Sequence, residues 1–336
     1  MRRRGAAVAA AVGCVMMIML LAVLNQPLDR RMSVMIPRSS VGASAVIDSI
    51  RSNAGKRHAW VTSTLVSVGL KITSRKVLPG WYHLARDASA LDIATMIVFG
   101  RREPLVKVTI PEGFTIERIA RRLTVRAGID SAAFRLWCQS DSVLRRFDVH
   151  APSMEGFLMP DTYFMIRGDD ARYVAELMAA QAQRVWSSLS GVDSLADWNT
   201  RLRLATLASI VQLEAAVDDE MPTIAGVYTN RLRIGMLLQA DPTVQYLTGR
   251  DRITASELRD ASNRYNTYVY KGLPPGPIGN PGRRALEAAC RPEIHEWIFF
   301  VARGDTSRRH RFARTLEEHN ANVRLYRTAR RESSLN

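Results

Sequence analysis

Cysteine is scarce in this chain of 336 residues, which contains three. The three cysteines share no metal-ligand spacing, and Cys14 lies in an apolar run. This pattern excludes a disulfide framework and a zinc site built from paired cysteines. The six histidines show no metal-ligand spacing either, and we expect each of them to have a surface or capping role. The sequence therefore predicts neither a metal site nor a cofactor.

Acidic residues are few relative to basic ones. The chain has 32 aspartates and glutamates against 47 lysines and arginines, which gives a formal net charge of +15. Such an excess favours contact with an anionic polymer or a membrane surface, and a solvated surface biased toward arginine would have the same composition. No basic stretch is interleaved with aromatic residues, and no glycine-rich phosphate loop is present. We therefore expect no nucleic-acid partner.

Charge is absent from residues 5–24, which follow three arginines at positions 2 to 4. An uncharged run of this length can cross the hydrocarbon core of a membrane as a helix. Positive charge before the run keeps the N-terminus in the cytoplasm. We predict a cytoplasmic tip and a single-pass anchor in the cytoplasmic (inner) membrane over residues 1–25, a linker over residues 26–44, and an extracytoplasmic remainder. A cleaved signal peptide is the alternative, but no A-x-A cleavage site follows the run.

Two successive strand–turn–helix patterns lie within residues 45–150. In the first, Ser89 can cap a helix with apolar residues on one face. In the second, residues 105–110 alternate as a strand, and Thr115 can cap a helix with apolar residues at i, i+3, i+4 and i+7. Small α/β units of this shape occur in glycan-binding modules, and a plain packing domain has the same pattern.

The helical pattern over residues 202–216 is the one around which we expect the rest of the chain to be organised. Its aliphatic residues form one apolar stripe, which is typical of a helix packed into a core. Glu214 lies within that stripe, whereas Ser209 and Gln212 point away from it. A carboxylate on a buried face is costly unless it is paired or neutral. Glu214 is therefore either the buried partner of an arginine or a general acid whose pKa is raised by desolvation.

Amide, hydroxyl and aromatic side chains follow Glu214 along the chain. Asp241 precedes Pro242 and is suited to be a helix N-cap. Residues 265–268 read YNTY, and residues 272–282 form a loop rich in glycine and proline. Loops of this kind commonly carry binding function. Aromatic and amide groups around a carboxyl group suit a sugar polymer, in which the acid would protonate a glycosidic oxygen.

A glycosidase ordinarily needs a second carboxylate. Asp241 and Glu220 are candidates, and neither is convincing from the sequence. Without a second carboxylate, a hydroxyl group of the substrate itself can attack the sugar. The cleavage is then of the lyase type and not a hydrolysis.

Several segments resemble the endolytic murein transglycosylase family, also called YceG-like. In chain order they are IPEG at 110–113, EGFLMPDTY at 155–163, ASIVQLE at 208–214, AGVYTNRLRIGM at 225–236, LQADPTV at 238–244, YNTY at 265–268, GLPPGPI at 272–278 and HN at 319–320. The resemblance spans residues 78–323 and the N-terminal anchor.

The resemblance implies an α+β protein in which the transmembrane helix is followed by a small LysM-like α/β subdomain over residues 45–150. Residues 151–336 would then form a mainly helical, lysozyme-like catalytic domain with a small sheet. The implied activity cuts nascent peptidoglycan strands between N-acetylmuramic acid and N-acetylglucosamine, leaves 1,6-anhydromuramoyl ends, and terminates glycan polymerisation near the cell-wall synthases.

Glu214 matches the catalytic glutamate of the family. The chain departs from the family pattern at Gln212, where a glutamate is usual, and at Met221, where an arginine is usual. Two alternatives stay open: a non-catalytic peptidoglycan-binding scaffold that recruits cell-wall synthases, and a hydrolase in which Asp241 works with water. We expect the glycan groove to be lined by Gln239, Thr243, Tyr265, Asn266, Thr267 and Tyr268, with Glu220, Asn230 and Asp241 as supporting residues.

Overall fold

The computed structural model describes residues 32–36, 56–74, 80–84, 88–99, 105–189, 197–250 and 252–333. The chain divides into two compact units, one up to Leu105 and one from Val106 onward, and each is described by itself. The predicted anchor lies outside the described residues. None of the described helices combines the length and the apolar character that a membrane span requires.

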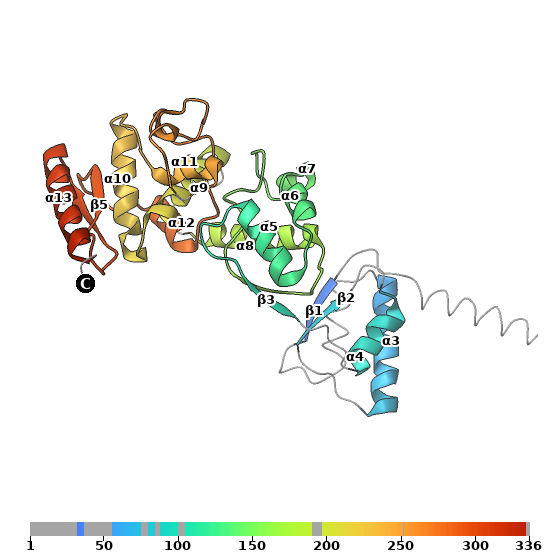
Figure 1. The fold of residues 1–336 in the computed structure, drawn as a ribbon. Helices are drawn as coiled ribbons and strands as arrows, with labels where there is room; N and C mark the ends of the chain where they lie inside the picture. Colours follow the sequence, from blue (N-terminus) through green and yellow to red (C-terminus); the bar gives the residue numbers. More distant parts are fainter. Residues whose placement is uncertain are drawn as a thin grey trace, which may run out of the picture. The chain divides into compact units, whose positions relative to one another are not determined.

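The first unit pairs a two-stranded sheet with two helices (Figure 1). Strand β1 (Met32–Ile36) runs antiparallel to β2 (Gly80–Leu84), and helix α3 (Lys56–Thr73) packs against α4 (Ala90–Phe99). The Ser89 hydroxyl accepts the N–H of Asp92 at 3.2 Å and caps α4 as the sequence predicts, and the Ser89 N–H donates to the Asp92 carboxylate at 2.9 Å. A linker was expected over residues 26–44. For residues 32–36 this expectation was wrong, because they form β1 and pair with β2.

The second unit begins with two antiparallel strands, and three helices lie between these strands in the sequence. Strand β3 (Val106–Thr109) pairs with β4 (Thr162–Met165), and the Thr115 hydroxyl caps the first of the helices between them, as predicted. These helices are α5 (Ile116–Ala127), α6 (Ser131–Cys138) and α7 (Asp141–Arg146). Residues 106–150 therefore belong to the same compact unit as the residues after 150.

The remainder of the second unit is mainly helical and ends in a small sheet. Its helices are α8 (Ala171–Ser188), α9 (Trp198–Glu214), α10 (Met221–Arg233), α11 (Asp241–Thr248), α12 (Arg283–Cys290) and α13 (Leu316–Ser333), with the 3₁₀ turns η2 (Asp218–Glu220) and η3 (Glu257–Arg259). The predicted C-terminal strands are present as β5 (Phe299–Ala302), which pairs antiparallel with β6 (His310–Ala313). Helices with small two-stranded sheets confirm the α+β class.

Helix α9 is an inner helix that packs against α10, α11 and α12 (Figure 1). Residues 205–211 are buried without interruption, so the helix has no solvent face over two turns. Ser209 was expected to point away from the core, and this was wrong. Its hydroxyl is fully buried, donates to the Thr206 carbonyl at 2.8 Å and accepts the N–H of Ile278 at 3.0 Å.

The loop over residues 272–282 docks on α9 through polar contacts. Besides the bond to Ser209, the N–H of Gly282 donates to the Gln212 side chain at 2.9 Å. Gly282 is the N-cap residue of α12, so Gln212 satisfies one of the free N–H groups at that helix start. Gln212 therefore joins two helices, and a glutamate at this position could accept the same N–H group.

A close contact between this loop and residue 156 leaves room for glycine alone. Gly156 has a φ of +85°, and a β-carbon on it would lie 2.4 Å from the Cγ atom of Pro277. Gly235 has a similar φ of +66°, but nothing lies within 4 Å of the position of its β-carbon. A substitution at Gly235 would therefore introduce backbone strain alone, whereas one at Gly156 would introduce strain and steric overlap.

We predict that Gly156→Ala lowers the free energy of unfolding by about 3 kcal/mol, because left-handed strain adds to overpacking. The matched variant Gly235→Ala should lose only the strain, about 1 kcal/mol. Urea denaturation of the full chain followed by circular dichroism measures both. Equal losses in the two variants would contradict the close docking of the loop.

Candidate active site

Glu214 is the last residue of α9, where the helix ends against α10. Its side chain is half-buried, and the hydroxyl of the fully buried Tyr228 shares a hydrogen bond with it. The pKa of Glu214 is raised to about 7. Loss of solvent around the carboxyl group is the largest cause, and the nearby charge of Asp241 adds to it, whereas the bond to Tyr228 and the charge of Arg231 act in the opposite direction. Glu214 can therefore hold a proton near neutral pH.

Arg231 lies on α10 close to Glu214, but its guanidinium group donates hydrogen bonds to backbone carbonyls. It is buried, its Nε donates to the Ile298 carbonyl at 2.6 Å, and its Nη1 donates to the Leu238 carbonyl. Burial lowers the pKa of this guanidinium. The ion pairs found among the described residues include none with Glu214. Among the described residues Glu214 therefore forms no ion pair with an arginine, although the charge of Arg231 acts on its pKa, and its role as a general acid stays a prediction.

Asp241 is held beside this centre by a tyrosine. The Tyr268 hydroxyl donates to Asp241 Oδ1 at 2.5 Å. The expectation that Asp241 caps a helix was wrong, because α11 starts one residue earlier than expected and Asp241 is its first residue. Ala240 takes the cap position, and the Thr267 hydroxyl accepts its N–H at 3.0 Å. The Asp241 carboxylate is thereby left beside Glu214.

Three of the predicted groove residues lie inside the protein. The hydroxyls of Thr243 and Thr267 are buried 2.9 Å apart. Asn266 has no exposed surface, and its Nδ2 donates to the carbonyls of Glu257 and Asp260 at 3.0 Å each. These side chains hold the loops on which the site is built. Their contact with a glycan stays a prediction.

The other predicted groove residues reach the surface. Gln239 is exposed and has a φ of +48°, a strained conformation of the kind that gathers at functional sites. Its N–H donates to the Thr267 carbonyl at 3.1 Å, which fixes the backbone there. Tyr265 is half-buried, with its ring centroid 5.0 Å from that of Tyr246, and Tyr268 is also half-buried. Gln239, Tyr265 and Tyr268 are thus the groove candidates with accessible surface.

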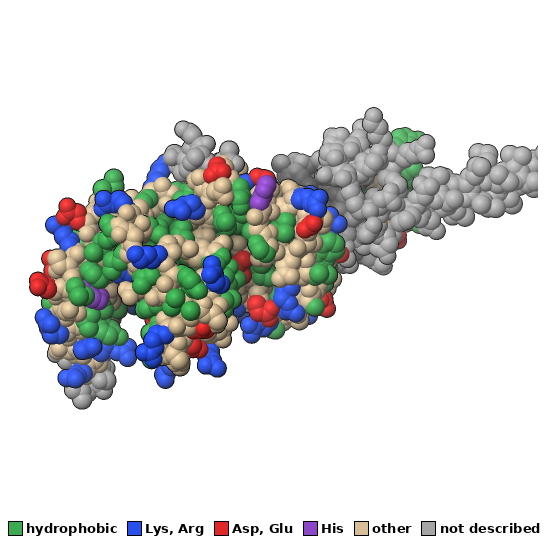
Figure 2. Space-filling model, turned by 90° about the horizontal axis from the view of Figure 1, so that it is seen from above, with side chains coloured by type: hydrophobic (Ala, Val, Ile, Leu, Met, Phe, Trp, Pro, Cys, Tyr) green, Lys and Arg blue, Asp and Glu red, His purple; other side chains and the backbone are tan. Residues whose placement is uncertain are grey.

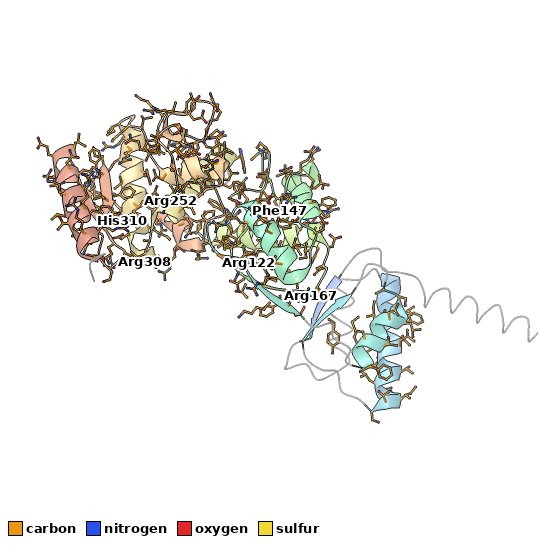
Figure 3. The ribbon with its side chains drawn as sticks, in the orientation of Figure 1. Arg122, Phe147, Arg167, Arg252, Arg308 and His310 are labelled. Atoms are coloured by element: carbon orange, nitrogen blue, oxygen red, sulfur yellow. The ribbon has the colours of Figure 1, made fainter. Side chains whose placement is uncertain are left out.

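The predicted supporting residues Glu220 and Asn230 hold the C-terminal hairpin. Glu220 is buried and accepts the N–H and the Nδ1 of His310, at 3.1 and 2.8 Å (His310 is labelled in Figure 3). Arg309 Nη1 lies 3.9 Å from Glu220, so a cation is present although Met221 replaces the usual arginine. Asn230 Nδ2 donates to the His295 carbonyl at 2.8 Å. The surface or capping role expected of His310 was wrong, because its ring binds a buried carboxylate.

Sequence reasoning missed a further buried acid, Glu155. It accepts the N–H of Ile116 at 3.1 Å, the Asn280 amide at 2.7 Å and the Tyr246 hydroxyl at 3.4 Å. Burial raises the pKa of Glu155 to about 8. The only sequence signal for this residue was that it opens a segment dense in glycine, proline and aromatic residues. Tyr228 was also missed, because it lies among the apolar positions of its helix and such a pattern carries no signal for its hydroxyl.

Comparison with known proteins agrees with the resemblance. The model of the YceG-like family matches residues 34–325. The chain is 27% identical to the endolytic murein transglycosylase of Bacillus subtilis over 271 residues, 75% of this chain and 74% of that protein. It is 27% identical to the protein of the same name from Streptococcus pneumoniae serotype 2 over 276 residues, 73% of this chain and half the length of that protein.

A solved structure shares the fold as well. The crystal structure of a yceG-like protein from Listeria monocytogenes superposes with a TM-score of 0.57 at 26% sequence identity, over 87% of this chain and 99% of that one. This chain belongs to the YceG-like family.

Proposed function

We propose that the chain is an endolytic peptidoglycan transglycosylase that cuts between N-acetylmuramic acid and N-acetylglucosamine and leaves 1,6-anhydromuramoyl ends. The observation that carries the proposal is the carboxyl group of Glu214, whose pKa of about 7 suits a group that both gives and takes a proton at neutral pH. The names of the relatives support a peptidoglycan transglycosylase role.

Glu214 would act twice in this reaction. As an acid it protonates the departing glycosidic oxygen while the muramoyl ring develops oxocarbenium character. As a carboxylate it then accepts the proton of the muramoyl O6 hydroxyl, which attacks C1 and closes the anhydro ring. The Tyr228 hydroxyl and the charge of Arg231 favour the carboxylate between the two steps. Asp241 favours the protonated form of Glu214 at the start.

This activity requires the enzyme to be located where peptidoglycan is made. We propose that residues 1–25 anchor the chain in the cytoplasmic membrane with the enzyme on the outer side, where nascent strands are extended by the cell-wall synthases. Termination of those strands is the proposed role. The uncharged run at residues 5–24 after three arginines supports the orientation.

A reporter fused after Asn336 tests this topology. If the reporter is an enzyme that works only outside the cytoplasm, the fusion should show reporter activity. The full chain should remain in the membrane pellet after carbonate extraction. A soluble mature chain that begins after residue 24 would show a cleaved signal peptide instead.

Glu214→Gln should lower the rate of anhydro-end formation by on the order of 10²-fold or more, because an amide cannot give or accept the proton. Mass spectrometry of digested peptidoglycan measures the ends. The amide fills the same volume, so glycan binding and the melting temperature should persist.

Glu287→Gln, which changes a half-exposed glutamate on α12, is the matched control and should keep wild-type activity. A folded Glu214→Gln enzyme with near wild-type activity would refute the assignment of the acid. Glycan binding with no released product from the wild-type chain would favour the scaffold alternative.

The pH dependence of kcat/KM should report the proton on Glu214. The acid form is needed at the start, so activity should be lost as pH rises through about 7. Asp241→Asn removes a charge that raises this pKa and should move the alkaline limb to lower pH. Tyr228→Phe removes a hydrogen bond that lowers it and should move the limb to higher pH. Shifts of the same sign in both variants would contradict this account.

A further inference from the structure

A cavity of about 460 Å³ opens beside the end of α9. It is enclosed by the start of α5, by Leu213 of α9, and by residues of α11. Leu213 directly precedes Glu214, and Pro242 directly follows Asp241, so two wall residues are chain neighbours of the two acidic residues of the site. The cavity is thus close to the proposed cleavage point, although it contains neither acid.

The walls of the cavity combine non-polar and basic side chains. Leu213, Pro242, Tyr246 and Ile278 supply non-polar surface. Arginines at positions 118, 121 and 250 supply positive charge, and Glu117 is the single acidic residue among the lining residues. By contrast, basic side chains are dispersed among other types over the face drawn in Figure 2. The cavity therefore has a net positive lining.

The arginines are available to a ligand. Arg121 and Arg250 each lie 3.4 Å from a carboxylate, with 69% of each arginine side chain exposed, and exposed pairs of this kind are weak. The Arg118 guanidinium lies 4.2 Å from the centroid of the Phe114 ring, which holds it in place without neutralising it.

The start of α5 contributes little to recognition, because two of its N–H groups are already hydrogen-bonded to side chains. Glu155 accepts the N–H of Ile116, and the Thr115 hydroxyl accepts that of Arg118. The arginine side chains would therefore carry the recognition of an anionic ligand. Guanidinium groups bind carboxylates in a planar, two-point geometry.

We propose that this cavity binds the acidic stem peptide of the muramoyl residue beside the bond that is cut. The carboxylates of the peptide would contact Arg118 and Arg250, and its alanyl methyl groups would lie on Leu213 and Pro242. The inference rests on the proposed function, because a stem peptide reaches this cavity only if the glycan passes Glu214. It assigns to the enzyme a preference for strands that still carry their peptides.

The first experiment compares two substrates with the full-length protein in detergent. Peptidoglycan strands are used intact, or after an amidase has removed their stem peptides. For Arg118→Gln/Arg250→Gln, kcat/KM on intact strands should fall by on the order of tenfold, mainly through KM, because charge-assisted contacts are lost. On peptide-free strands the change should be less than twofold. Arg126→Gln, an exposed arginine of α5 outside the cavity, should match the wild type on both.

An equal loss on both substrates, or no loss on either, would overturn the peptide site. A wild-type protein that forms no anhydro ends from either substrate would refute the proposed function, and the peptide site would then be decided by binding alone.

The second experiment measures that binding by calorimetry with a synthetic L-alanyl-γ-D-glutamyl-meso-diaminopimelyl tripeptide. The wild-type chain and Arg126→Gln should bind it equally, and the double variant should bind it at least tenfold more weakly. The same tripeptide with its carboxylates amidated should bind as weakly to the wild type. Equal binding of the amidated and free peptides, or no binding of either, would overturn the proposal without reference to catalysis.

Discussion

The structure of the catalytic unit depends on one buried amide, that of Asn280. Its oxygen accepts the N–H groups of Gly156 and Leu158 at 2.9 Å each, and its Nδ2 donates to the Phe114 carbonyl at 2.9 Å and to Glu155 at 2.7 Å. Leaving buried partners of this kind unpaired costs about 1–3 kcal/mol for each group. The amide therefore fixes the loop that carries it against segments more than a hundred residues away. The same loop binds α9 through Ser209 and Gln212, and the last of these lies two residues before Glu214.

Two opposing influences act on that carboxyl group. Burial and the charge of Asp241 favour the proton on Glu214, and Tyr228 and Arg231 favour its loss. In the proposed reaction, a group balanced between these influences would serve first as an acid and then as a base, and no second catalytic carboxylate would be needed. Tyr268 contributes indirectly, since its hydrogen bond holds Asp241 in place. This balance is a property of five side chains from α9, α10, α11 and the loop after η3.

The parts of this arrangement that follow from local chemistry could be predicted from the sequence. Ser89 and Thr115 cap their helices because the capping interaction spans three residues. The position of Glu214 among aliphatic neighbours predicted either the partner of an arginine or a general acid, and the family resemblance implied the acid. The burial of Ser209 could not be predicted in this way, because a single-stripe pattern assumes a solvent face that an inner helix lacks. The partners of Glu155, Asp241 and Glu220 lie between 27 and 125 residues away, beyond the reach of any periodicity.

The most direct measurement is the fate of solvent oxygen during cleavage in ¹⁸O-labelled water. If Glu214 activates the muramoyl O6 hydroxyl, the new ends are 1,6-anhydromuramoyl groups that contain no ¹⁸O, because no water enters the reaction. Mass spectrometry of the product ends should therefore show unlabelled anhydro sugars. New reducing ends that carry one ¹⁸O atom would show that water, and not the O6 hydroxyl of the substrate, is the nucleophile, and would contradict the account.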